Sequence, residues 1–360
     1  MLAVLSLTAC GVADTGGGTG DGAGSTTSRS APDLTAVKPL ADPRDWLGVV
    51  TAEPADTAVD PVADPVPKLP VTVTDAQGTK VTVSDADRIL ALDVYGTYAR
   101  TVFELGLGSH VVGRDVSTQF PEARSLPLAT TSGHELNAEA ILKLDPDVVL
   151  VDTTLGPWSV IEQLRSSGIP VVVLPSVRSI GNVGQLARDV ADALGVPAAG
   201  RALAERVDAG IDRTTAQIVK VAPADESRKL RTVFLYVRGH SGVYYMFGEG
   251  SGADSLIDAL GLYDVAKEID WSGMKPVTDE GVIAAQPDLI LMMTDGLKSV
   301  GGVDGLLKRI PALAQTPAGK NHRIVDMADS EILGFGPLTA TVLNALAVAI
   351  YAPGAVAEKS

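Results

Sequence analysis

The stretches LNAEAILKLDPDVVLV (136–151) and VTDEGVIAAQPDLILM (277–292) follow one plan. Each has a residue that favours a helix N-cap, a glutamate in the first helical turn, a short apolar helix, a Pro-Asp pair and an apolar strand. The Pro-Asp pair stops the helix and begins the strand. A plan that recurs in each half of the chain predicts two equivalent α/β lobes. The caps and first-turn glutamates are Asn137 and Glu139 in the first stretch, and Thr278 and Glu280 in the second.

Strand-like and helical runs alternate on both sides of these stretches, which predicts βαβ units and largely parallel sheets. Period-two alternation around Gln77-Gly78 predicts a hairpin at 71–83. Residues 182–221 read as helical almost throughout, with a break near Gly195-Val196-Pro197, and predict one long helix that joins the lobes. The predicted strands cover 88–93, 110–115, 147–152, 169–175, 231–237, 288–293 and 322–327.

The first 68 residues differ in composition from the rest of the chain. MLAVLSLTA (1–9) is a short apolar run that ends at Cys10, the single cysteine, in the pattern of a bacterial lipobox. No basic residue precedes this run, so we expect the true start to lie upstream. Residues 11–68 are rich in Gly, Ser, Pro and Asp, and predict a flexible tether. The predicted division is therefore a signal remnant (1–10), a tether (11–68), an N-terminal lobe (69–181), an interlobe helical segment (182–222) and a C-terminal lobe (223–360).

Charge and motifs exclude several function classes. The net charge of −15 disfavours a nucleic-acid binder, which needs a basic face. The chain has no GxGxxG after a strand, no GxxxxGK[ST], no GxSxG and no HExxH. The four histidines are far apart in sequence. A binding protein is therefore favoured over an enzyme.

Tyr236 and Arg238 stand at the end of a predicted strand, where residues i and i+2 point the same way. A guanidinium beside a phenol favours the phenolate, which is a hard ligand for ferric iron and a known haem ligand. From these residues alone, an ordinary strand-end tyrosine beside a surface arginine is the favoured alternative.

His134 follows Gly133 in a loop just before the helix of Glu139. Such a histidine is more often a solvated loop residue than a ligand. Its loop is equivalent to Ser272–Lys275 in the other half, however, so both loops would border a cleft if the lobes face each other. Glu139 and Glu280 are either helix-dipole partners or one docking carboxylate per lobe.

Two groups of segments resemble a known family. The segments 137–150, 160–175 and 278–296 resemble substrate-binding proteins of the helical-backbone class, which serve siderophore, cobalamin and haem importers. The more specific segments resemble the haem-binding lipoproteins of actinobacterial haem importers, of HmuT type, over roughly residues 70–352. These are GRDVSTQFPEARSLP (113–127), LYVRG (235–239), GLKSVGGVDGLLKRIPALAQTPAGKNHRIVDM (296–327) and LGFGP (333–337).

The resemblance implies an α/β fold of two Rossmann-like lobes, each with a mainly parallel sheet, bridged by a long rigid helix. It implies haem in the cleft, with His134 and Tyr236 as axial ligands of the iron and Arg238 hydrogen-bonded to the tyrosine. It also implies salt bridges from both repeated glutamates to the permease. The apolar residues expected to line the haem are Leu155, Trp158, Met274 and Met293, and Met274 replaces an aromatic residue common in relatives.

The resulting expectation is a monomeric, lipid-anchored haem-binding protein on the outer face of the cell membrane. Its partners would be an ABC permease with its ATPase, and haemoproteins as a haem source. The same fold with a ferric siderophore or cobalamin as cargo is the first alternative. A surface-anchored enzyme and a purely structural surface protein remain as the others. Whether His240 competes as a ligand stays open.

Overall fold

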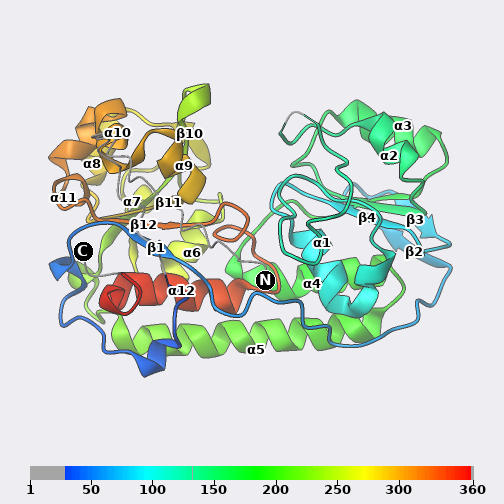
Figure 1. The fold of residues 1–360 in the computed structure, drawn as a ribbon, viewed down its shortest axis with the longest axis horizontal. Coiled ribbons are helices and arrows are strands. Elements are labelled where there is room, and N and C mark those ends of the chain that lie inside the picture. The colour runs from blue at the N-terminus through cyan, green and yellow to red at the C-terminus, as the bar shows by residue number, and fades with distance from the viewer. Residues whose placement is uncertain (1–28, 132, 358–360) are drawn as a thin grey trace, which may run out of the picture.

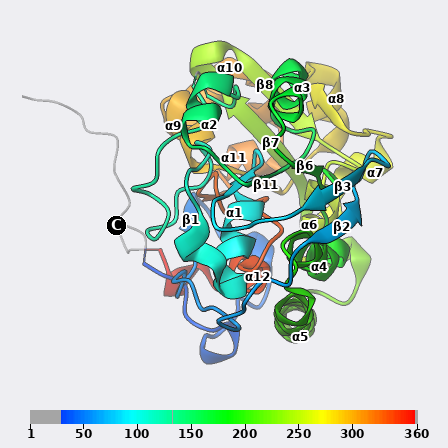
Figure 2. The ribbon, with the colours of Figure 1, turned by 90° about the vertical axis from the view of Figure 1, so that its right-hand side faces the viewer.

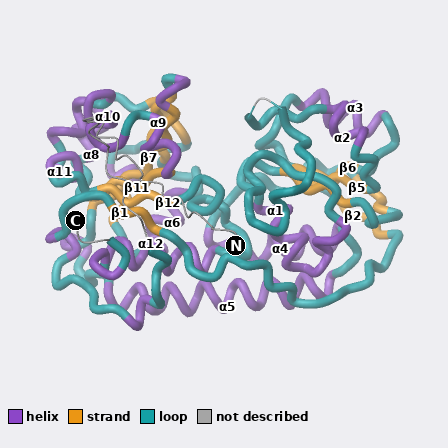
Figure 3. The backbone as a smooth tube through the Cα atoms, viewed as in Figure 1, coloured by secondary structure: helices purple, strands orange, loops and turns teal. Residues whose placement is uncertain are grey.

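The computed structural model describes residues 29–131 and 133–357. Figure 1 shows two lobes that stand side by side on a common base of helices. The view from the side places the long helix α5 at the bottom of the molecule, away from α2 and α8 (Figure 2). In the tube view, strands fill the middle of each lobe and helices surround them (Figure 3).

The N-terminal lobe is built on a parallel sheet of β4 (Ile89–Leu92), β5 (Val148–Val151) and β6 (Val171–Val173) in that order. A separate hairpin pairs β2 (Val71–Thr74) with β3 (Lys80–Val83), as predicted. The expected strand at 110–115 is absent, since only isolated bridges occur at Val111 and Arg114. The helices of this lobe are α1 (Thr97–Val102), α2 (Ala138–Lys143), α3 (Trp158–Ser166) and α4 (Val183–Ala193).

The C-terminal lobe has a mixed sheet that is mainly parallel, as predicted. β12 (Ile324–Met327), β11 (Leu289–Met293), β7 (Arg231–Arg238) and β9 (Tyr263–Asp264) run parallel, whereas β8 (Val243–Phe247) and β10 (Met274–Pro276) add antiparallel strands. The sequence predicted the first strand of the β7–β8 hairpin, at 231–237, but not β8, which follows the turn at 239–242. The helices of this lobe are α6 (Ala253–Ala259), α7 (Val265–Glu268), α8 (Asp279–Ala285), α9 (Thr294–Ser299), α10 (Gly302–Arg309), α11 (Pro317–Lys320) and α12 (Thr339–Tyr351).

The helical base joins the lobes. α5 (Pro197–Val221) is 25 residues long and begins after the predicted break, with Pro197 at its first position. One cluster of buried residues runs through this base and includes Leu150 from one sheet and Phe234 from the other. The outer faces of the two sheets have clusters of their own. Successive residues of β5 alternate between the inner and outer clusters, as expected for a strand buried on both faces.

Residues 29–68 are not a flexible tether. β1 (Val50–Ala52) pairs with β12 as a parallel edge strand of the C-terminal sheet, and Ala31 and Leu34 are buried. The segment then crosses to the other lobe, where Lys68 N donates to Gly195 O. The tether prediction is therefore wrong for residues 29–68. The polar composition of this segment gave no sign of the few apolar residues that are buried against the helical base. The rest of the predicted tether, together with Cys10, lies outside the described residues.

The internal repeat is visible in backbone geometry. Asn137 and Thr278 cap α2 and α8 as expected, accepting from the N–H groups of Ala140 and Gly281. Within two residues after each helix, a residue in the left-handed region stands directly before a proline, with φ of 48° at Asp145 and 38° at Gln286. That left-handed residue breaks the helix before the proline does. The two halves thus share the same type of N-cap and the same type of helix termination.

Candidate functional site

The carboxyl ends of the parallel strands of both lobes carry the polar residues of the site. Arg238 ends β7, Met293 ends β11, and Asp329 lies two residues after β12. In the other lobe Asp93 and Asp152 follow β4 and β5 directly. Ligands of open α/β sheets bind outside this edge of the strands.

Tyr236 is held between two neighbours. Its ring stacks on Phe247 of β8, with 5.7 Å between centroids and an interplanar angle of 18°. The Arg238 guanidinium carbon lies 4.4 Å from the Tyr236 ring centroid. The tyrosine is half-buried, so one part of its side chain remains accessible to a ligand.

Arg238 donates to three acceptors in the structure. Nη1 donates to Val237 O (2.9 Å), and Nη2 donates to Asp329 Oδ2 (2.5 Å) and lies 3.6 Å from Met293 Sδ. The tyrosine hydroxyl is not among these acceptors. The arginine therefore contacts Tyr236 through the ring face, whereas the family resemblance implied a hydrogen bond to the hydroxyl.

His134, the ligand predicted from the other lobe, lies in the loop before α2. Its side chain is reached by solvent, yet burial among neighbouring atoms lowers its pKa, and the positive charge of Arg238 lowers it further. A lowered pKa keeps the imidazole neutral, the form that binds a metal.

The repeat extends to the loops of His134 and Met274. The preceding glycines, Gly133 and Gly273, both have φ of 66°, a left-handed conformation that favours glycine. Met274 lies on the edge strand β10 with 61% of its surface exposed and pairs with Phe247. The two lobes thus present equivalent turns, one with an imidazole and one with a thioether.

The remaining predicted lining residues divide into two groups. Met293 is 7% exposed and contacts Arg238, so it belongs to the surroundings of Tyr236. Leu155 is 3% exposed and sits in the N-terminal core. Trp158 packs against that same core, with the Arg165 guanidinium 5.9 Å from its ring. Core packing accounts for the positions of these two residues.

Glu139 and Glu280 are exposed in the first turns of α2 and α8. Both helices lie at the ends of their lobes that are distant from α5 (Figures 1 and 2). Asp329, in contrast, escaped the sequence analysis. Its only signal was its place shortly after an apolar strand whose carboxyl end faces the site.

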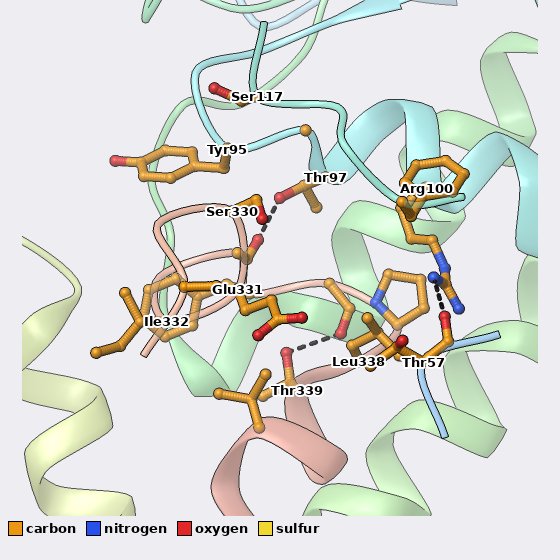
Figure 4. Close-up of a pocket in the computed structure, with 18 of the residues that line it drawn as sticks. Thr57, Tyr95, Thr97, Arg100, Ser117, Ser330, Glu331, Ile332, Leu338 and Thr339 are labelled. Carbon is orange, nitrogen blue, oxygen red and sulfur yellow. Dashed lines mark hydrogen bonds between the residues drawn. The ribbon is translucent and has the colours of Figure 1, made fainter. Parts of the chain in front are cut away.

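A cavity of about 340 Å³ lies between the lobes beside this site. Its walls come from the start of α1, the loop at 117–124 and the segment 328–339, which Figure 4 shows converging. Thr97 of one lobe donates to Gly334 O of the other across it. None of the predicted iron ligands lines this cavity. We therefore assign it to the junction of the lobes.

A family model described as periplasmic binding protein matches residues 94–331. The chain belongs to the periplasmic binding protein family. Its members bind ligands and do not catalyse reactions, and they act with ABC transporters. Within residues 29–131 and 133–357, no helix is both long and apolar enough to span a bilayer.

Solved members of the family share the fold. A structure described as heme binding protein HmuT has a TM-score of 0.82 and 40% identity over 86% of this chain and 99% of that one. The periplasmic heme-binding protein RhuT from Roseiflexus sp. RS-1 has a TM-score of 0.67 and 37% identity over 74% of this chain and 99% of that one. A protein from Halobacterium salinarum described as cobalamin-binding is 30% identical over 62% of this chain, and the match spans 58% of that protein.

Proposed function

We propose that this protein captures ferric haem outside the cell membrane and passes it to an ABC importer. The observation that carries the proposal is the half-buried Tyr236 at the carboxyl end of β7, held between the Phe247 ring and the Arg238 guanidinium. An imidazole and a phenol from opposite lobes are both established haem ligands. Haem between the lobes would also bury apolar macrocycle surface, which favours binding.

The solved relatives support the same cargo. Structures of the HmuT protein include variants with alanine in place of a histidine, a tyrosine, and an arginine two residues after that tyrosine. Tyr236 and Arg238 have the same spacing. The neutral His134 would supply one iron ligand and Tyr236 the other, while Arg238 favours the negative charge of a bound phenolate.

Delivery requires the protein to meet a permease. The exposed Glu139 and Glu280, one on each lobe, would pair with basic residues on two permease subunits. A permease that draws the lobes apart would separate His134 from Tyr236 and release haem. A lipid on Cys10 would keep the protein at the membrane surface.

A titration of the protein with haemin, followed by absorbance, tests the proposal. We expect a saturable Soret band and a charge-transfer band, which change in His134→Ala and in Tyr236→Ala. His110→Ala and Tyr263→Phe, which lie outside the site, are matched controls and should behave as wild type. A wild-type protein without a saturable haem spectrum would refute haem capture.

Cobalamin is the second candidate, because the Halobacterium relative is described as binding it. The same protein is therefore titrated with hydroxocobalamin and with a ferric siderophore. Tight binding of either, together with no uptake of haemin, would transfer the proposal to that cargo.

A further inference from the structure

Within the part of the chain that the structure describes, Asp329 is the only acidic side chain in contact with the Arg238 guanidinium. The other contacts of that guanidinium are a carbonyl oxygen, a thioether and the Tyr236 ring face. Charge-assisted hydrogen bonds are about twice as strong as neutral ones. The carboxylate is therefore the strongest restraint on where the guanidinium lies.

The carboxylate of Asp329 is itself fixed at both oxygens. Oδ2 accepts from Arg238, and Oδ1 accepts from the backbone N–H of Asp295 in the first turn of α9 (3.1 Å). The two bonds join the segment after β12 to the ends of β7 and α9. The side chains of Arg238 and Asp329 are 30% and 22% exposed, so the pair is partly shielded from water.

We propose that Asp329 is a positioning residue that holds Arg238 against the Tyr236 ring and thereby maintains the tyrosine–haem contact. The inference rests on the proposed haem function. An arginine side chain has several rotatable bonds, and without its carboxylate it would sample solvent. The ring would then keep only Phe247 as a stacking partner, and the phenolate would lose a nearby positive charge.

The first test needs no haem. In ¹⁵N spectra of the haem-free full-length protein, the Arg238 guanidinium signals are assigned by their loss in Arg238→Lys. We expect hindered rotation, seen as separate Nη signals, in wild type and in Asp304→Ala, a control with an exposed aspartate of the same lobe. The signals should merge in Asp329→Ala. Separate Nη signals in that variant would overturn the proposal.

The second test measures haem loss to excess apomyoglobin and the iron–phenolate band in resonance Raman spectra. Asp329→Ala should lose haem about tenfold faster, the effect expected for one hydrogen bond to a charged group. Asp329→Asn, which keeps an acceptor oxygen, should lose haem at a rate between those of wild type and Asp329→Ala. The double variant Asp329→Ala/Arg238→Ala should lose haem no faster than Arg238→Ala, because one residue acts through the other.

Two outcomes overturn the proposal in this second test. One is a wild-type rate and band in Asp329→Ala, and the other is a full addition of the two single effects. If wild type takes up no haem, the proposed function fails, whereas the haem-free spectra still decide whether Asp329 holds Arg238.

Discussion

Single residues at the end of the N-terminal sheet form a buried charged cluster. Arg178 Nη2 donates to Asp152 Oδ2 (2.8 Å) and Asp93 Oδ2 (3.2 Å), and all three side chains are almost fully buried. The Arg178 guanidinium also lies 4.7 Å from the ring centroid of Tyr98. Asp115, equally buried, accepts from Asp93 N. Two buried carboxylates thus share one guanidinium, and a third buried carboxylate, that of Asp115, is bonded to the backbone of one of them.

Removal of that guanidinium should be costly. We expect Arg178→Ala to lower the free energy of unfolding by about 3–5 kcal/mol, because it leaves buried carboxylates without a cation. Urea unfolding measures the change. Arg188→Ala, whose partner Asp208 lies 4.0 Å away at the surface, is the control and should cost less than about 1 kcal/mol. Equal losses in the two variants would contradict this account of the cluster.

The same cluster predicts a pH dependence. Burial raises the pKa of Asp93 to about 6 and that of Asp115 to about 7, with Arg178 opposing the effect at Asp93. Groups with raised pKa values bind protons more tightly in the folded state, so their contribution to stability is complete below about pH 4, the value of an unfolded aspartate. It is lost as the pH rises through about 6 to 7.

We therefore expect Asp115→Asn to flatten the fall in unfolding free energy between about pH 4 and pH 7 relative to wild type. Urea unfolding at a series of pH values checks this. An exposed carboxylate gives the control, Asp304→Asn, which should keep the wild-type slope. An unchanged slope in Asp115→Asn would show that its proton does not titrate in this range.

At the scale of elements, pattern predicted most of the regular structure. Strands β4, β5, β6, β7, β11 and β12 and the paired helices α2 and α8 lie where apolar runs and caps placed them. The strands that the sequence missed share a cause. β1, β8 and β10 are short edge or hairpin strands that form through pairing with a neighbouring strand, and such tertiary contacts leave little trace in local sequence.

The strand β1 gives a test at this scale. We expect hydrogen exchange to show protected amides at 50–52 in the native protein, since β1 is paired with β12 and Val50 is buried. Val50→Asp should remove that protection by placing a charge in the core. Thr35→Asp, at an exposed position of the same segment, is the control. Exchange at 50–52 as fast as in an unfolded peptide would mean that the segment is a tether after all.

At the scale of the whole molecule, the sequence predicted two lobes on a long helix, and the structure shows them. It could not show that residues 29–68 pack against both lobes, because composition averages over the few buried residues of that segment. The candidate site also has a part that the sequence predicted and a part that it did not. Tyr236, Arg238 and Met293 lie together, whereas the partner Asp329 is 91 residues from Arg238 in sequence. A contact over that separation has no local signature.

The repeat of the lobes leads to the last prediction, which concerns docking. Glu139 and Glu280 are exposed, they occupy equivalent first turns, and neither belongs to the surroundings of Tyr236. Glu139→Ala/Glu280→Ala should therefore bind haemin like wild type but stimulate the ATPase of the importer much less. Reconstituted importer in proteoliposomes gives the ATPase rate. Each single variant should have an intermediate effect, because each lobe would meet one permease subunit.

Glu162→Ala/Glu205→Ala is the matched control for this experiment, since both of these glutamates are exposed but lie on α3 and α5. Removal of two acidic charges from any surface lowers long-range attraction to a basic partner by a similar amount, and salt screens that effect. If the contact is specific, ATPase stimulation should instead fall only in Glu139→Ala/Glu280→Ala, and it should fall at every salt concentration. Equal losses in both double variants would therefore assign the effect to net charge and would leave the two first-turn carboxylates as partners of their helix dipoles.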